Sequence, residues 1–246
     1  MSNYKLTIQY DGTKYNGWQI QQSSDNTIQG KLISVINRLT NEEVNIIGSG
    51  RTDAGVHAKA QIANVHLKKE YDTGKLLAQI NHYLPEDIAV TDISIVDERF
   101  HARFNAISKR YQYRIYTGIY PNVFERKYVY TYLDKELNVE EMIKASKYLL
   151  GTHDFMSFCG NKHMKKSAVR TISDIQIKRN NNEIVIDYIG DGFLQNMIRI
   201  ITGTLIEVGN GSKNHSDIPA ILDSHNRENA GFTAPASGLC LMEVNY

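Results

Sequence analysis

Apolar and polar residues alternate at the start of the chain, over residues 4–10. The apolar positions are Tyr4, Leu6, Ile8 and Tyr10, with a polar residue between each pair. This period of two is typical of a half-buried strand. From residue 28 onward the apolar positions recur every three or four residues, at Ile28, Leu32, Ile36 and Leu39. That period predicts a helix, with Asp25 or Thr27 available to cap its first turn.

Similar patterns predict strands and helices along the rest of the chain. We expect strands at residues 44–47, 61–67, 88–96, 108–116, 172–178, 183–189 and 239–244, and helices at 75–84, 138–149 and 194–208. Asn138 followed by Glu141 is typical of a helix capping box, and the asparagines at 180–182 are typical of a hairpin turn. The sum predicts an α+β fold with helices packed on a sheet face. We place a boundary near Ala106, which gives an N-terminal domain at 1–106 and a C-terminal domain at 107–246.

Composition narrows the class of protein. The chain has 246 residues, of which 41% are hydrophobic and 22% charged, and four are prolines, as in a folded globular protein. No apolar run approaches the roughly 18 residues needed to span a bilayer, and the first residues lack a signal-peptide pattern. We therefore expect a cytoplasmic protein with no membrane partner. Cys159 and Cys240 lie far apart with no CxxC spacing, which favours two free thiols over a disulfide framework or a thiolate metal cluster.

Positive charge is concentrated in two stretches, although the formal net charge is only +1. The stretches contain no Asp or Glu; they run over residues 99–114 (Arg99, Arg103, Lys109, Arg110, Arg114 and His101) and 161–173 (Lys162, Lys165, Lys166, Arg170 and His163). Such stretches are often only solvated faces. Aromatic residues interleave with the cations of the first stretch, and Phe155 and Phe158 precede the second. Phosphate contacts supply most nucleic-acid affinity, so we interpret both stretches as surfaces that follow an RNA backbone.

The densest chemical signal is the segment from Gly48 to Ala58, which presents Arg51, Thr52 and Asp53 among three glycines. Glycines allow a tight turn with positive φ, and a loop of this kind can expose a reactive side chain. An ordinary turn containing an aspartate is the alternative. The segment lacks the spacing of a phosphate-binding loop, and the eight histidines lack the spacing of a metal site. We expect no metal and no cofactor, and we assign His57 a structural role in the loop.

The segment Gly50-Arg-Thr-Asp-Ala-Gly-Val-His57 resembles the catalytic loop of the TruA family of tRNA pseudouridine synthases. Five other segments resemble the family in the same order: Tyr10-Asp-Gly-Thr-Lys-Tyr-Asn-Gly-Trp-Gln19, Phe100-His-Ala-Arg-Phe104, Lys109-Arg-Tyr-Gln-Tyr113, Gly192-Phe-Leu-Gln-Asn-Met-Ile-Arg199 and Thr233-Ala-Pro-Ala-Ser-Gly-Leu239. Ordered motifs along nearly the whole chain make coincidence a poor explanation.

The resemblance implies an enzyme and its site. Asp53 would be the catalytic residue, Arg51 and Arg199 its cationic neighbours, and Tyr111 the residue that contacts the target base. The family isomerises uridine to pseudouridine at positions 38, 39 and 40, in the anticodon arm of tRNA, and needs no cofactor. Its members are homodimers with two α+β domains, each built on an antiparallel sheet flanked by helices, and with the active-site cleft between the domains.

Other interpretations of these residues remain open. Arg199 lies in an apolar helical segment and could extend its guanidinium to solvent, and Tyr111 could be an ordinary core residue of its strand. For the whole protein, the rivals are an RNA-binding module without catalysis, a hydrolase with Asp53 as nucleophile, and a paralogue that acts at a different position or on a different RNA.

Overall fold

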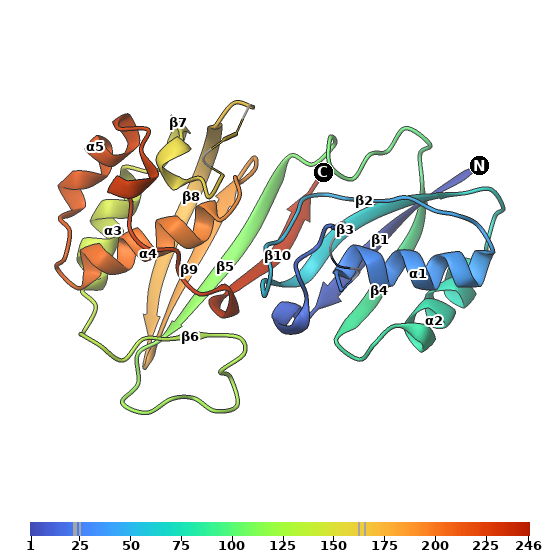
Figure 1. Ribbon diagram of the computed structural model, residues 1–246, viewed down its shortest axis with the longest axis horizontal. Coiled ribbons are helices and arrows are strands. Elements are labelled where there is room, and N and C mark those ends of the chain that lie inside the picture. Colours follow the sequence, from blue (N-terminus) through green and yellow to red (C-terminus); the bar gives the residue numbers. More distant parts are fainter. Residues whose placement is uncertain (22–23, 25, 162, 165) are drawn as a thin grey trace. The chain divides into compact units, whose positions relative to one another are not determined.

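The computed structural model describes residues 1–21, 24, 26–161, 163–164 and 166–246. It forms two compact units: Met1–Ile107 together with Cys240–Tyr246, and Ser108–Leu239 (Figure 1). The division expected from the sequence, 1–106 and 107–246, differs in the last strand. That strand returns to the first unit because it pairs with a strand there.

The first unit contains five strands and two α-helices among its described residues: β1 (Ser2–Tyr10), α1 (Ile28–Thr40), β2 (Ile46–Gly48), β3 (His57–Leu67), α2 (Thr73–Tyr83), β4 (Ile88–Val96) and β10 (Leu239–Asn245). The strand order is β4-β1-β3-β10, and the short β2 pairs with β3. Strand β1 is antiparallel to both of its neighbours, whereas β10 runs parallel to β3.

The predicted patterns account for these elements. The alternating Tyr4, Leu6 and Ile8 are all nearly fully buried, which gives β1 one face in the core. Helix α1 begins after Thr27, whose side chain accepts a hydrogen bond from the Gly30 N–H, so Thr27 is the cap; Asp25 lies outside the described residues. Helices α1 and α2 cover one face of this sheet (Figure 1), and each has a buried apolar stripe.

The second unit contains five strands and three α-helices among its described residues: β5 (Ser108–Tyr116), β6 (Tyr130–Thr131), α3 (Val139–Lys147), β7 (Gly151–Asp154), β8 (Val169–Asn180), β9 (Glu183–Gly190), α4 (Met197–Gly209) and α5 (Ile218–Asp223). The strand order is β5-β9-β8-β7, with β6 beside β5. The Asn138 side chain caps α3 by accepting from the Glu141 N–H, and Asn181, with a φ of 51°, turns the hairpin between β8 and β9. Nearly every residue of α4 is buried.

The α+β fold that the sequence predicts is confirmed. The sequence analysis also expects an antiparallel sheet in each domain; most strand pairs are antiparallel, but β10 pairs with β3 and β6 with β5 in parallel. No tight hairpin joins either pair, so chain connectivity does not impose an antiparallel direction. In the part of the chain that the structure describes, no helix is long and apolar enough to cross a membrane.

Candidate active site

The glycine-bearing segment connects β2 to β3 in the first unit, and β3 fixes its first residues. The Ser49 N–H donates to the Ile62 carbonyl oxygen at 2.7 Å, and Gln61 Nε2 donates to the Gly50 carbonyl oxygen at 3.1 Å. The Ser49 hydroxyl also donates to Gln61 Oε1 at 2.6 Å. Because Ser49 and Gln61 are fully buried, water does not compete for these bonds.

The middle of this loop is held by the residues around the end of β1. The Trp18 N–H donates to the Thr52 carbonyl oxygen at 3.1 Å, and the Gly55 N–H donates to the Tyr15 carbonyl oxygen at 3.3 Å. The buried hydroxyl groups of Tyr10 and Thr52 share a hydrogen bond of 2.9 Å. The loop is therefore bound on both sides by the body of the first unit.

Asp53 begins a tight turn within this loop. Its carbonyl oxygen accepts a hydrogen bond from the Val56 N–H at 3.1 Å, which closes a four-residue turn. Gly55 in this turn has a φ of 79°, a conformation that favours glycine. The Asp53 side chain is half-buried. A backbone closed in this way presents the carboxylate from a fixed position.

Two glycines allow the segment after β1 to approach the loop closely. A Cβ atom on Gly12 would overlap the carbonyl oxygen of Val56. A Cβ atom on Gly17 would lie 2.6 Å from the Thr52 carbonyl oxygen, and Gly17 also has a φ of 89°. Any side chain at these positions would push against the backbone that carries Asp53.

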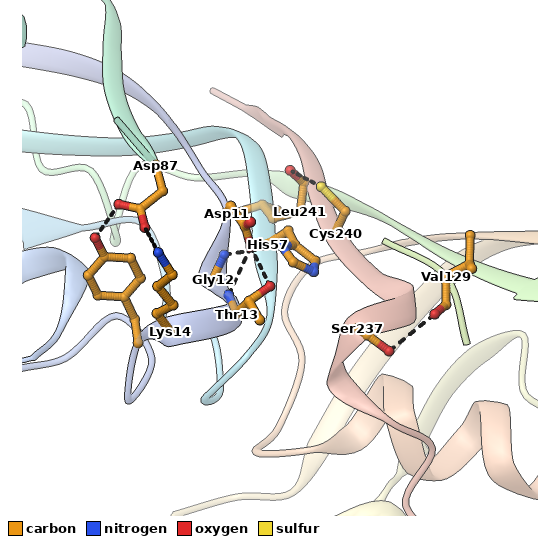
Figure 2. A network of polar contacts seen from close by, with 11 residues as sticks. Asp11, Gly12, Thr13, Lys14, His57, Asp87, Val129, Ser237, Cys240 and Leu241 are labelled. Atoms are coloured by element: carbon orange, nitrogen blue, oxygen red, sulfur yellow. Dashed lines mark hydrogen bonds and ion pairs between the residues drawn. The ribbon is translucent and has the colours of Figure 1, made fainter. Parts of the chain in front are cut away.

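His57 has the structural role that the sequence predicts for it. The ring is buried at the start of β3, and its Nδ1 accepts a hydrogen bond from the Gly12 N–H at 3.1 Å (Figure 2). Asp11 Oδ1 lies 3.3 Å from the same Nδ1, a contact that is an ion pair when the ring is protonated. Asp11 Oδ1 also accepts from the N–H and the hydroxyl of Thr13, at 3.0 and 2.5 Å. His57 thereby ties the loop to the segment after β1.

Arg51 lies two residues before Asp53, and its side chain is exposed. Its Nε donates to Gln19 Oε1 at 3.1 Å. Gln19 in turn donates through Nε2 to Oε1 of Gln29, at 2.7 Å. The family resemblance implies that Arg51 is a site residue but assigns no role to either glutamine.

Tyr111 lies on β5 in the second unit and is 7% exposed. Its ring meets the Phe193 ring edge to face, with 5.4 Å between centroids. Tyr113, on the same strand face, donates its hydroxyl hydrogen bond to the Pro235 carbonyl oxygen at 2.7 Å. Tyr111 therefore packs among aromatic residues, as the core interpretation expects, and has an aromatic face suited to stacking wherever a base reaches it.

Arg199 lies near the start of α4 in the second unit and is half-buried. Its Nε donates to the Ala234 carbonyl oxygen at 2.7 Å, and Nη1 donates to Asn196 Oδ1 at 2.8 Å. The Arg199 carbonyl oxygen accepts from the Ala234 N–H at 3.0 Å. Within its unit, the guanidinium thus secures the segment around Ala234.

The four predicted site residues thus divide between the two units. Arg51 and Asp53 share one loop of the first unit, whereas Tyr111 and Arg199 belong to the second. No group of His, Cys, Asp or Glu side chains suited to hold a metal ion occurs among the described residues.

A model of the family described as tRNA pseudouridine synthase matches residues 6–105 and 145–246. The chain belongs to the tRNA pseudouridine synthase family. It is 46% identical to tRNA pseudouridine synthase A of Bacillus sp. (strain KSM-64), 46% to tRNA pseudouridine synthase A 2 of Clostridium perfringens, and 44% to tRNA pseudouridine synthase A of Acetivibrio thermocellus, each over 100% of both chains. The family and the isomerase class predicted from the sequence are confirmed. A solved structure of a Cbf5-Nop10-Gar1 complex covers 97% of this chain and 48% of its own, at 10% identity and a TM-score of 0.38.

The family match includes three of the four predicted site residues. Arg51, Asp53 and Arg199 lie within the matched residues, whereas Tyr111 falls between the two matched ranges. The residues that fix the Asp53 loop, such as Tyr10 and Gln19, lie in a segment that the sequence marks as family-like without assigning them a role.

Proposed function

We propose that this chain isomerises uridine to pseudouridine at positions 38, 39 and 40 in the anticodon arm of tRNA, with Asp53 as the catalytic residue. The reaction breaks the bond between uracil N1 and the ribose C1′, turns the base, and joins C5 to C1′, while C5 loses its proton and N1 takes one up. A carboxylate at the sugar can assist as nucleophile or base, and the isomerisation is redox-neutral. The observation that carries the proposal is the family's Asp53 loop, with its backbone bound on both sides.

The other three residues have proposed roles in substrate binding. A uridine inside a stem must leave the base stack before an enzyme can act on it. Tyr111 would stack on the extruded uracil, and Arg51 and Arg199 would contact the RNA or the carboxylate. We also propose that the enzyme acts in the cytoplasm, because its proposed substrate is tRNA.

Replacing Asp53 by Asn tests the proposal. The amide keeps the shape of the side chain but cannot act as a nucleophile or base, so release of tritium from tRNA containing 5-tritiated uridine should cease. Affinity for tRNA should stay within a few-fold. The exposed Asp92 on β4 provides the matched control, Asp92→Asn, which should keep full turnover. Turnover retained in pure Asp53→Asn protein would remove Asp53 from this role, and absence of turnover in the unsubstituted protein would favour the non-catalytic RNA-binding alternative.

The target positions need their own test. Several relatives are named tRNA pseudouridine synthase A 2, so the paralogue alternative has a concrete form. Pseudouridine mapping in tRNA from cells with and without the gene should show loss at positions 38, 39 and 40. Loss at other positions, or in another RNA, would support the paralogue with a shifted target.

We also propose that the protein is a homodimer. The segment between β5 and β6 supports this, because several of its large apolar side chains are exposed; Ile119 is 87% and Phe124 is 93% exposed. A contiguous exposed apolar patch marks an association surface, and we propose that these side chains form one. Sedimentation equilibrium should give twice the mass of one chain, and Phe124→Ser should shift the equilibrium toward monomer. A monomer at all concentrations would contradict the proposal.

A further inference from the structure

A chain of side-chain amides begins at Gln29, in the first turn of α1. Gln29 is only 6% exposed, and its Nε2 donates to the Ile46 carbonyl oxygen at 2.7 Å. Its Oε1 accepts from the Ile20 N–H at 2.9 Å and from Gln19 Nε2 at 2.7 Å. Turning this amide over would place an oxygen against the Ile46 oxygen and an NH₂ group against two donors. The orientation of Gln29 is therefore fixed by its neighbours.

The orientation of the Gln29 amide determines the orientation of the Gln19 amide. Since the Gln19 NH₂ group must face Gln29 Oε1, the Gln19 oxygen faces the other way, and it accepts from Arg51 Nε at 3.1 Å. The backbone supports the same arrangement, because the Gln29 N–H donates to the Trp18 carbonyl oxygen at 3.0 Å. A buried residue of α1 thus determines which acceptor an exposed arginine meets.

Within the described part of the chain, Arg51 forms its side-chain hydrogen bond at Nε and no ion pair with a carboxylate. The side chain as a whole is exposed, and its guanidinium ends in two further nitrogens, Nη1 and Nη2. An anionic oxygen can approach a guanidinium through its Nε side or through the terminal pair. Because Gln19 occupies Nε, the terminal pair is the donor set that this arrangement leaves for an anion.

We infer that Gln19, oriented by Gln29, is a positioning residue that holds Arg51 so that Nη1 and Nη2 bind a phosphate of the RNA substrate beside Asp53. The inference rests on the proposed function, since it takes RNA as the substrate. A free arginine loses much side-chain entropy when it is immobilised on a ligand. A side chain that is already restrained at Nε loses less, so Gln19 strengthens RNA binding without touching the RNA.

The test compares Gln19→Ala, Arg51→Gln and the double variant with the unsubstituted protein, using tritium release from tRNA. Gln19→Ala should raise KM about 3- to 10-fold, the cost of ordering one long side chain, and should leave kcat within about twofold. Arg51→Gln should raise KM further and reduce the slope of log affinity against log salt by about one unit or less. The double variant should match Arg51→Gln, because Gln19 acts only through Arg51. The exposed Gln79 of α2 provides the control Gln79→Ala, with no expected change.

Two outcomes would overturn the inference: losses that add fully in the double variant, or a Gln19→Ala enzyme with unchanged KM. Gln19→Met, which keeps the side-chain length and removes the acceptor, repeats the test if Gln19→Ala does not fold. Failure of the proposed function is distinguishable, because it would abolish tritium release in the unsubstituted protein before any variant is compared.

Discussion

At the scale of single residues, the hydroxyl pair of Tyr10 and Thr52 fixes the backbone next to Asp53. Both side chains are buried, and burial raises the pKa of Tyr10 well above its usual value, so the hydroxyl stays protonated at any physiological pH. Tyr10→Phe should leave the Thr52 hydroxyl without this partner and reduce the free energy of unfolding by about 1–3 kcal/mol. Urea unfolding measures the loss. The double variant Tyr10→Phe with Thr52→Val removes both hydroxyls and should recover part of that stability; no recovery would mean that the hydrogen bond is not the cause.

Substitutions at and near Arg199 can separate the contribution of its charge to activity from the contribution of its packing. Arg199→Met keeps helix propensity and most of the apolar stem but removes both donors, to the Ala234 carbonyl oxygen and to Asn196. We expect the variant to fold and to turn over at least tenfold more slowly, because the proposed role in the site requires the charge. That decrease corresponds to a loss of about 1.4 kcal/mol or more of transition-state stabilisation. Asn196→Ala removes one acceptor and keeps the cation, so it should retain most activity. Equal activity losses in the two variants, measured by tritium release alongside thermal unfolding, would assign Arg199 to anchoring the Ala234 segment alone.

At the scale of elements, the close approach of the segment after β1 to the Asp53 loop depends on Gly12. A methyl group there would overlap the Val56 carbonyl oxygen, so the backbone of one segment must move. Gly12→Ala should destabilise the protein by several kcal/mol, on the order of the largest single-residue effects, and lower turnover. Gly74→Ala is the matched control in α2, where the added Cβ meets nothing closer than 3.4 Å. It should stabilise the helix by about 0.5–1 kcal/mol. Similar melting temperatures for the two variants would contradict this account.

Elements with a strong local pattern could be predicted from the sequence. Strands β4 and β5 have the predicted bounds, and α1 and α3 begin after the predicted caps Thr27 and Asn138. Elements that depend on partners distant in the sequence could not be predicted. Strand β3 starts at His57, inside the glycine-bearing segment, where it pairs with β10 from the other end of the chain. The short β6, β7 and α5 have too few residues to show a period.

Parts of the candidate site that belong to a local motif could be predicted, and parts that depend on tertiary contacts could not. Arg51 and Asp53 could be predicted because they lie two residues apart in a segment with a recognisable motif. The bond between Gln19 and Gln29 could not be found, since it requires the start of α1 to pack beside the loop. The acceptor at Ala234 for Arg199 could not be predicted either, because Ala234 lies 35 residues away in the sequence.

At the scale of the whole molecule, acidic residues from other segments neutralise some cations of the two basic stretches, although the stretches themselves contain no acid. In the first, Arg110 forms an ion pair with Asp187 at 3.1 Å, and Arg114 lies between Glu183 and Glu125, at 2.5 and 3.0 Å. Strand β9, antiparallel to β5, supplies two of these acids. In the second stretch, Arg170 donates to the carbonyl oxygens of Ser167 and Val169, and Lys162 and Lys165 lie outside the described residues. A segment without acids is therefore not a cationic surface throughout.

This balance predicts which cations contribute to RNA binding. Arg99 and Arg103 are exposed, and neither forms an ion pair within the described part of the chain. Releasing counterions from RNA requires cations that are not already neutralised, so each of Arg99→Gln and Arg103→Gln should reduce the slope of log affinity against log salt by about one unit or less. Arg114→Gln should leave the slope unchanged but lower the free energy of unfolding by about 1–3 kcal/mol, because it leaves two partly buried carboxylates without their donor. Filter binding of tRNA between low and physiological salt measures the slopes. A reduced slope for Arg114→Gln together with unchanged slopes for Arg99→Gln and Arg103→Gln would show that the RNA contacts the sheet cations and displaces their internal partners.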